Sequence, residues 1–208
     1  MKTSLIRLIC KAMTEFTPIP NLKPLQGLER VAIIGVGFAS NNRKNTNRKP
    51  GKSNDEIATI VSEIWLEAQD LGVETLVMIQ REVAESLCKN YPTVPITKIL
   101  EEVGDEVHIS SEDILGQAWE TASRAGIVDA IVVAHKRHAL RCAWNAEMWG
   151  FRVRFPRRFA FSYTWKDRPS QTQWHTWNAP IYFLWELLSR AKLVAVDFWR
   201  HSSNRTKS

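Results

Sequence analysis

The sequence predicts an α/β fold, in which helices cover both faces of a mostly parallel sheet, and three observations support this prediction. Apolar runs of strand length recur at residues 31–38, 73–79 and 127–134, and segments with helix signals separate them. The run at 31–38 is apolar throughout, as in strands that are covered on both faces, which is typical of parallel sheets. The 208 residues are 44% hydrophobic and 24% charged, a composition typical of one globular domain. These features together predict a Rossmann-like architecture.

The chain before and after the first strand is expected to be irregular. Three prolines within residues 18–24 favour an extended lead-in, because proline disfavours helix at its own position and at the residue before it. Residues 39–53 are polar and basic and contain a Pro-Gly turn, which predicts a loop. A helix follows, and we expect Ser53, Asn54 or Asp55 to cap it.

The alternation of strands and helices continues to the end of the domain. Residues 81–90 predict a short helix, and within the ambiguous stretch 94–109 the expected strand is 107–109. We expect one α/β domain at 31–196, between a lead-in at 1–30 and a tail at 197–208. The other predicted elements are a helix at 113–125 capped by Ser110 or Ser111, a strand at 127–134, a helix at 137–149 ending at Gly150, a strand at 151–155, an irregular stretch at 156–180 and a helix at 180–196.

Charge is distributed unevenly along the chain. The net charge is +6, but residues 53–130 carry 4 basic and 16 acidic groups, net −12. Residues 131–208 carry net +10, and residues 43–52 carry net +5. A uniformly basic protein is therefore excluded, and any polyanion partner has to use local basic segments.

Three cysteines lie far apart and have no metal-ligand spacing, so neither a disulfide framework nor a metal site is predicted. The histidines also lack a recognised metal spacing. A reducing, cytoplasmic location fits this cysteine usage. No apolar stretch reaches the length of a membrane span, and a short apolar patch at residues 5–9 is expected to pack on the body rather than to anchor the chain at a membrane surface.

The carboxyl ends of parallel strands are where ligands bind in such sheets, and this rule selects three segments. The first contains Gly35 and Gly37, followed by Asn41, where glycines after a buried strand permit a sharp turn and close approach to a ligand. It lacks the third glycine of a dinucleotide fingerprint, and the alternative is that the glycines only turn the chain. The second contains Ser111 and Asp113 at a helix start, where they either contact a polar ligand or only cap the helix.

The third segment contains His135, His138 and Arg141, and it follows the clearest predicted strand. His138 and Arg141 are three positions apart and share a helix face. Histidine transfers protons near neutral pH and arginine binds phosphate or carboxylate, so this segment predicts an anion site with His138 as the candidate catalytic residue. The alternative is a charged surface cluster, which the dipole of a helix disfavours at its N-terminus.

The order of these segments resembles the YdcF-like domain-of-unknown-function family, which includes the SanA and ElyC envelope proteins. The similarity covers about residues 31 to 193 and is most specific at His138-x-x-Arg141. The other matches, in chain order, are Gly35 and Gly37, Ser111 with Asp113, Gln117 and Ala118, the strand entry at 150–153, and Trp177 with Glu186. The resemblance implies a Rossmann-like fold, binding of S-adenosylmethionine or a nucleotide, and no established reaction.

The sequence also departs from that family's pattern. Gly116 and Gln117 stand where the family has Glu and Asn, and residues 80–82 replace a Gly-Gly pair. If the family positions contact a ligand, this protein binds a different ligand or binds the same one poorly.

The function predicted from the sequence is binding of a small anionic or nucleotide-containing ligand at the strand ends. Whether a reaction follows is open, and a transferase or hydrolase acting on a phosphate-bearing or nucleotide substrate is compatible with the residues. One alternative is a nucleic-acid-binding protein that uses the basic loop 43–52 and the arginines of 152–158. Another is a non-catalytic interaction protein whose acidic and basic faces recognise a partner.

Overall fold

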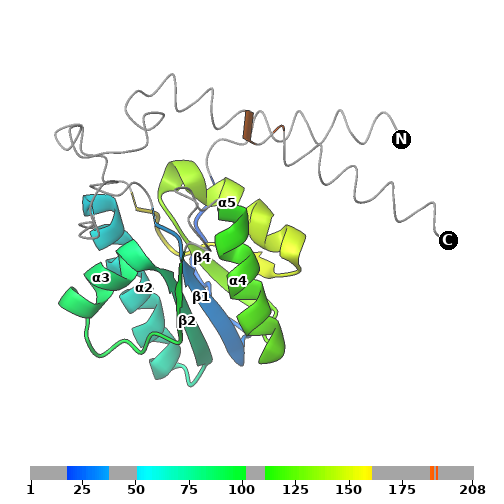
Figure 1. Ribbon diagram of the computed structural model, residues 1–208. Coiled ribbons are helices and arrows are strands. Elements are labelled where there is room, and N and C mark those ends of the chain that lie inside the picture. The colour runs from blue at the N-terminus through cyan, green and yellow to red at the C-terminus, as the bar shows by residue number, and fades with distance from the viewer. Residues whose placement is uncertain (1–17, 38–50, 102–110, 161–187, 190, 192–208) are drawn as a thin grey trace.

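The computed structural model describes residues 18–37, 51–101, 111–160, 188, 189 and 191, and it confirms the α/β prediction. Five parallel strands form one sheet in the order β3-β2-β1-β4-β5. Helices α2 and α3 cover one face, and α4 and α5 cover the other (Figure 1). The elements, labelled as in Figure 1, are β1 (Arg30–Gly35), α2 (Lys52–Asp70), β2 (Glu74–Gln80), α3 (Arg81–Asn90), β3 (Lys98–Leu100), α4 (Ser111–Arg124), β4 (Asp129–Val133), α5 (Lys136–Trp149) and β5 (Arg152–Arg154).

Strand β1 lies at the centre of the sheet, which explains its continuous apolar run. Its side chains alternate between the faces, so Val31 and Ile33 enter the core under α2 and α3, whereas Ala32 and Ile34 enter the core under α4 and α5. All four are 0% exposed. Full burial of one isoleucine side chain contributes roughly 1.5–3 kcal/mol, so a polar residue at any of these positions would disrupt one of the two cores.

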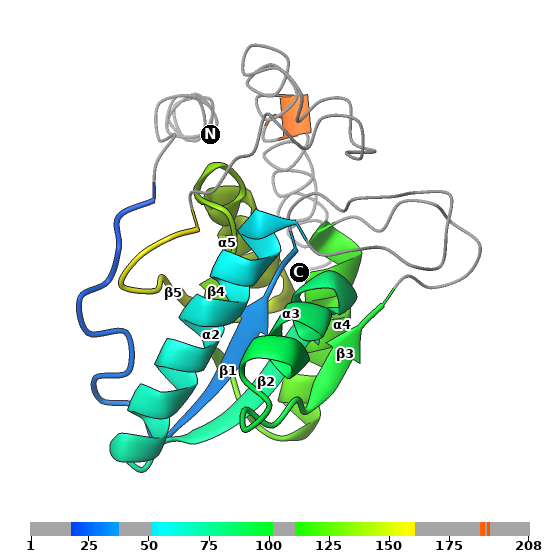
Figure 2. The ribbon, with the colours of Figure 1, turned by 90° about the vertical axis from the view of Figure 1, so that its left-hand side faces the viewer.

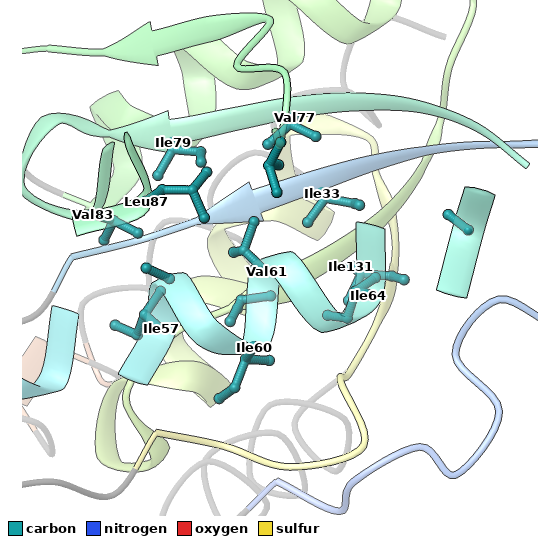
Figure 3. Packing of buried hydrophobic residues seen from close by; sticks show 14 of the residues in the cluster. Ile33, Ile57, Ile60, Val61, Ile64, Val77, Ile79, Val83, Leu87 and Ile131 are labelled. Carbon is teal, nitrogen blue, oxygen red and sulfur yellow. The ribbon is translucent and has the colours of Figure 1, made fainter. Parts of the chain in front are cut away.

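The core between the sheet and α2–α3 shows why residues 52–70 form an amphipathic helix (Figure 3). Apolar side chains of α2 recur at helical spacing and face the strands, while α3 adds Val83 and Leu87 from the side. The side chains from α2 are Ile57, Ile60, Val61 and Ile64, and those from the sheet are Ile33, Val77, Ile79 and Ile131.

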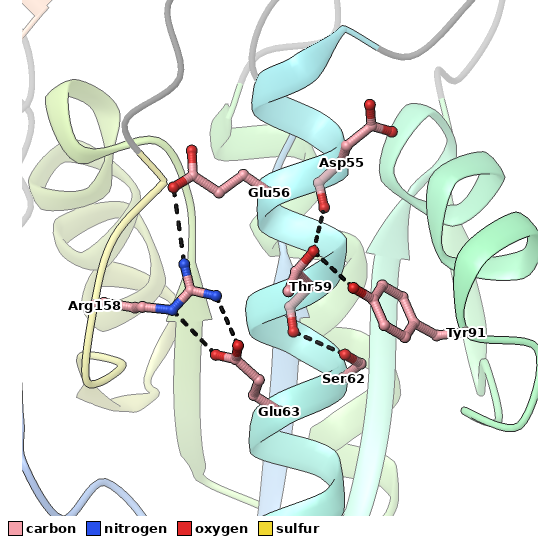
Figure 4. A network of polar contacts seen from close by, with 7 residues as sticks. All are labelled: Asp55, Glu56, Thr59, Ser62, Glu63, Tyr91 and Arg158. Atoms are coloured by element: carbon pink, nitrogen blue, oxygen red, sulfur yellow. Dashed lines mark hydrogen bonds and ion pairs between the residues drawn. The ribbon is translucent and has the colours of Figure 1, made fainter.

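Polar contacts hold α2 to the chain segments on either side of it (Figure 4). Tyr91, directly after α3, donates its hydroxyl proton to Oγ1 of Thr59 at 2.9 Å. On the other side, Arg158 reaches from the segment after β5 and donates from Nη2 to Oε1 of Glu63 at 2.7 Å. Helix α2 therefore links the α3 side of the molecule to the segment that follows the edge strand β5.

The third strand lies at Lys98–Leu100, whereas the predicted segment 107–109 is outside the described residues. β3 is short and lies at the edge of the sheet, and of its three residues only Leu100 is buried. A strand with one buried side chain has no apolar run that a sequence pattern would detect. Its start is held instead by Thr97, whose Oγ1 accepts a hydrogen bond from the Val77 N–H at 3.0 Å.

The predicted helix caps were only partly correct. Helix α2 begins at Lys52 with Gly51 as its N-cap and no side-chain cap, so capping by Ser53, Asn54 or Asp55 was wrong. The predicted end of the 137–149 helix at Gly150 is confirmed, because Gly150 is the C-cap of α5 with φ 118°. Of the helix expected at 180–196, only residues 188, 189 and 191 are described, and these are helical.

The lead-in before β1 packs on the domain. Leu25 is buried in the core under α2, and Arg154 of β5 donates from Nη1 to the carbonyl oxygens of Pro24 and Gln26 at 3.1 and 2.8 Å. Residues 18–29 are therefore held against the sheet edge at β5. In the part of the chain that the structure describes, no helix combines the length and the apolar character needed to cross a membrane.

Candidate functional site

The strand order reverses between β1 and β4, and this is the position where open parallel sheets bind ligands. From β1 the chain moves through α2 to β2, on one side, whereas from β4 it moves through α5 to β5, on the other. The two strands run side by side to their carboxyl ends, where the Val36 N–H donates to the Val133 carbonyl at 2.9 Å. Figure 2 shows the first turns of α2 and α5 at this same end of the sheet.

Gly35 and Gly37 lie at the end of β1, but neither has the left-handed conformation of a turn glycine. A Cβ added to Gly35 would lie 3.1 Å from Cγ2 of Ile79 and 3.4 Å from Cγ2 of Val61, so Gly35 lets α2 and the neighbouring strand pack closely. Gly37 donates its N–H to Oε1 of Gln80 at 2.9 Å. Gly35 is thus a core position and Gly37 a position at the site, while the predicted ligand residue Asn41 is outside the described residues.

The side chain of Gln80 also occupies a backbone donor at the end of β1 that a ligand could otherwise use. A Cβ added to Gly37 would lie 3.2 Å from Oε1 of Gln80 and 3.5 Å from Oδ1 of Asn54, so these two side chains lie close to this glycine. Its N–H is engaged with Gln80 and is not offered to a phosphate. The Gly37 N–H therefore does not contribute to a backbone cradle for phosphate, and the loop that follows it lies outside the described residues.

His135 follows β4 and caps α5. Its Nδ1 accepts a hydrogen bond from the Arg137 N–H at 3.3 Å, and its side chain is buried, with 2% of the residue exposed. Its backbone pairs with Ala160, and the Lys136 N–H donates to the Ala160 carbonyl at 2.9 Å. The visible role of His135 is therefore to start the helix, and the contact with Ala160 was not predictable because the two residues are far apart in the chain.

His138 and Arg141 lie on one face of α5, as predicted from their spacing. Nη2 of Arg141 is 2.7 Å from Nδ1 of His138, and the histidine is 8% exposed. A guanidinium can only donate hydrogen bonds, so Nδ1 is the acceptor and the neutral ring carries its proton on Nε2. The pair therefore combines a fixed positive charge with an imidazole N–H donor, which is suited to an anionic ligand.

Ser111 begins α4 and contacts α5 through Asn145, a residue that the sequence reasoning missed. Nδ2 of Asn145 donates to Oγ of Ser111 at 2.9 Å. Asn145 is four positions after Arg141 and seven after His138, so all three share one face of α5. The spacing of Asn145 from His138 and Arg141 could have identified it as part of this face. It was missed because an asparagine inside a helix is usually solvated. Asp113, in contrast, is exposed in the first turn of α4.

The face of α5 that carries these polar residues continues into its contact with α4. One turn beyond Asn145, the Trp149 Nε1–H donates to the Glu112 carbonyl at 3.1 Å. Residues 139, 142 and 146 form the apolar face of α5 that packs on the sheet. His138 and Arg141 therefore lie on the same face of α5 that, further along the helix, contacts α4 through Asn145 and Trp149.

The predicted residues form two groups rather than one. Gly37 and His135 lie at the adjoining ends of β1 and β4. His138 and Arg141 lie on the polar face of α5, and Ser111 of α4 joins this second group through its hydrogen bond with Asn145. Gly35 and Asp113 lie outside both groups. In the part of the chain that the structure describes, no cluster of three metal-binding side chains occurs.

The departures from the YdcF-like pattern have structural partners in this protein. Gly116 faces Trp149, and a Cβ there would lie 2.9 Å from Cζ2 of the indole. Gln117 exchanges hydrogen bonds with the backbone of Glu101 just after β3, at 2.7 and 3.3 Å. Arg81 pairs with the carboxylate of the same Glu101 at 2.6 Å. These positions hold β3, α4 and α5 together.

The arginines of 152–158, which the nucleic-acid alternative requires, contact the protein itself. Arg152 pairs with Asp129 at 2.5 Å, Arg157 with Glu67 at 2.5 Å and Arg158 with Glu63 at 2.7 Å. The hydrogen bonds to Glu63 raise the pKa of Arg158 above its usual value. Of the basic loop 43–52, only Gly51 and Lys52 are within the described residues. Arg157 and Arg158 connect the chain after β5 with α2, whereas Arg152 joins the edge strand β5 to β4.

Comparison with known proteins finds no matching family model, no matching curated protein and no matching solved structure. The resemblance to the YdcF-like family therefore stays a prediction.

Proposed function

We propose that this protein binds a small ligand that carries a phosphate or another anionic group, at the carboxyl ends of β1 and β4. The observation that carries the proposal is the Arg141–His138 pair, with 2.7 Å between Nη2 and Nδ1, on the helix that follows the reversal point of the sheet. Arg141 supplies charge and parallel N–H donors, and His138 supplies an N–H donor from Nε2.

The start of α5 supports an anionic ligand for a second reason. Its first turn contains Lys136, Arg137 and His138 and no acidic residue. Cations at a helix N-terminus lie next to the positive end of the dipole, and each such placement costs roughly 0.3–1 kcal/mol. Helix α4 shows the usual arrangement, with Glu112 and Asp113 in its first turn. Lys136, Arg137 and the positive end of the helix dipole would all attract an anion bound at the start of α5.

The ligand is placed on the α5 side of the reversal point rather than in a loop cradle after β1. Gln80 occupies the backbone donor of Gly37, so the end of β1 acts as a wall of the site. In this arrangement His138 acts as a hydrogen-bond donor, and in a reaction it would deliver the Nε2 proton to an oxygen of the bound group.

Isothermal titration calorimetry with inorganic phosphate, ribose 5-phosphate and S-adenosylmethionine tests the proposal. Arg141→Ala should lower the affinity for the phosphate compounds at least about tenfold, because a charge-assisted hydrogen bond contributes about 1.5–3 kcal/mol. Arg141→Lys should recover only part of this, since lysine keeps the charge and loses the planar donor pair.

The matched control is Arg124→Ala, which removes the same charge from the last turn of α4. Arg124 is 76% exposed and pairs only locally with Glu120, four residues earlier. It should leave the phosphate affinity unchanged. Equal losses for Arg124→Ala and Arg141→Ala would show that only net charge matters, and absence of phosphate binding to the unmodified protein would refute the proposal.

A further inference from the structure

The amide of Asn145 lies at the junction of α5 with the start of α4. Asn145 is 3% exposed, and its Nδ2 donates to Oγ of Ser111, the first residue of α4, at 2.9 Å. Its Oδ1 is inaccessible to solvent and has no hydrogen-bond partner among the residues that the structure describes. A buried polar atom without a partner is rare in folded proteins, because its desolvation is not compensated.

The position of this atom relates it to the anion site. Asn145 follows Arg141 by four residues on the same helix face, which places it about 6 Å further along α5. His138 is seven residues away, or about 10 Å along the helix. The unsatisfied atom therefore belongs to a residue on the polar face of α5 that carries the Arg141–His138 pair.

We propose that Asn145 binds a hydroxyl group of the ligand, so that the ligand is a sugar phosphate. This inference rests on the proposed function, because the phosphate is placed at Arg141. A hydroxyl both donates and accepts hydrogen bonds, so it satisfies the free end of the amide in either orientation of the side chain. A pentose phosphate carries its phosphate and its hydroxyls on one small molecule, as the placement of Arg141 and Asn145 on one helix face requires.

The small exposed fraction of Asn145 also limits which groups of a ligand can reach its amide. Oδ1 is closed to solvent, so a ligand hydroxyl reaches it only when the side chains at the α4–α5 junction move apart. Inorganic phosphate has no such group and would contact the Arg141 side alone. The ligand's hydroxyl should therefore contribute selectivity for sugar phosphate over free phosphate.

Calorimetric titration of ribose 5-phosphate and inorganic phosphate against Asn145→Leu tests this inference. Leucine has a similar size and no polar atom. We expect the ratio of the ribose 5-phosphate affinity to the inorganic phosphate affinity to fall about tenfold, the effect of one buried hydrogen bond. The melting temperature of the ligand-free variant should change little, because removal of the unsatisfied atom offsets the loss of the hydrogen bond to Ser111.

Ser62→Ala is the matched control. It removes a buried hydroxyl that donates to the Thr59 carbonyl within α2, on the opposite face of the sheet, and should leave the affinity ratio unchanged. If Asn145→Leu does not fold, Ser111→Ala replaces it, because loss of the Ser111 hydroxyl releases the amide from its position. The ratio should then fall in the same direction.

The outcomes separate the two proposals. An unchanged ratio in both variants, with phosphate binding still lost in Arg141→Ala, overturns the hydroxyl contact and leaves the anion site standing. A water molecule that satisfies Oδ1 would produce this result. If neither compound binds to the unmodified protein, the anion site fails and the hydroxyl contact fails with it.

Discussion

Replacing Gly150 with alanine should destabilise the protein for two separable reasons. Gly150 ends α5 with φ 118°, a conformation that L side chains rarely adopt. A Cβ at this position would lie 2.8 Å from Cη2 and 2.9 Å from Cζ2 of Trp119 on α4. Trp119 cannot simply turn away, because its ring packs edge-on against Phe151 with 4.9 Å between the ring centroids.

The magnitude follows from adding the two effects. Left-handed backbone at a non-glycine residue costs about 1–2 kcal/mol, and an extra carbon in a packed contact costs about 1–3 kcal/mol. We expect Gly150→Ala to lower the free energy of unfolding by about 3 kcal/mol. For a domain of this size that corresponds to a decrease in the melting temperature of roughly 6–12 °C.

Two further glycines separate these effects. Gly72 has φ +68° and no atom within 4 Å of an added Cβ, so Gly72→Ala should show only the backbone cost. Gly116 lies inside α4 and has the close contact with Trp149 without the unusual backbone. Gly116→Ala should therefore show only the packing cost, reduced by about 1 kcal/mol because alanine favours helix over glycine.

Urea unfolding followed by far-ultraviolet circular dichroism measures all three variants against the unmodified protein, provided the dependence on urea concentration keeps its slope. A Gly150→Ala variant no less stable than Gly72→Ala would refute the close packing of Trp119. As a second check, Trp119→Leu in the Gly150→Ala background should restore part of the lost stability, which a double-mutant cycle would record as coupling.

Three smaller effects follow from the surface contacts and the end of β1. Arg158→Ala should lower the free energy of unfolding by about 1 kcal/mol or less, since its bond to Glu63 is partly exposed, and the difference should shrink in high salt when measured by urea unfolding. The hydrogen bond from Arg30 lowers the pKa of Glu74, so its contribution to stability is present above its ordinary value of 4.5 and is lost as the pH falls through the lowered value. Thermal melts from pH 7 down to pH 3 should therefore lose less stability in Glu74→Gln than in the unmodified protein, and parallel curves would contradict this. Gly37→Ala should be nearly neutral for stability in thermal melts, because the added carbon meets the flexible end of Gln80, whereas a large loss would show that this side chain is rigidly held.

Much of the fold was predictable because its strands and helices have local signals. The apolar run of β1 indicated a central strand, and the short helix at 81–90 has the predicted bounds in α3. β3 was missed because an edge strand with one buried residue carries almost no periodic signal. The start of α2 was misassigned because Ser53 and Asn54 are good caps by residue type, whereas both are buried inside the helix.

The candidate site was predictable only where its residues share one helix. His138 and Arg141 are three positions apart, so their contact follows from helical geometry. The bond from Gly37 to Gln80 joins residues 43 positions apart, and the bond from Asn145 to Ser111 joins residues 34 positions apart. No local sequence pattern predicts either hydrogen bond, because these residues come together only when the strands assemble in their order in the sheet.

By itself, the sequence determined that this protein is an α/β protein with its central strand at the end of the lead-in and a basic helix start after β4. These properties follow from the local spacing of apolar and charged residues. Only the tertiary structure decided that Gln80 accepts the hydrogen bond of Gly37, that Arg157 and Arg158 bind α2, and that Asn145 extends the polar face of α5. The physical reason is that each of these contacts depends on the order of strands, which brings together side chains that the chain itself keeps far apart.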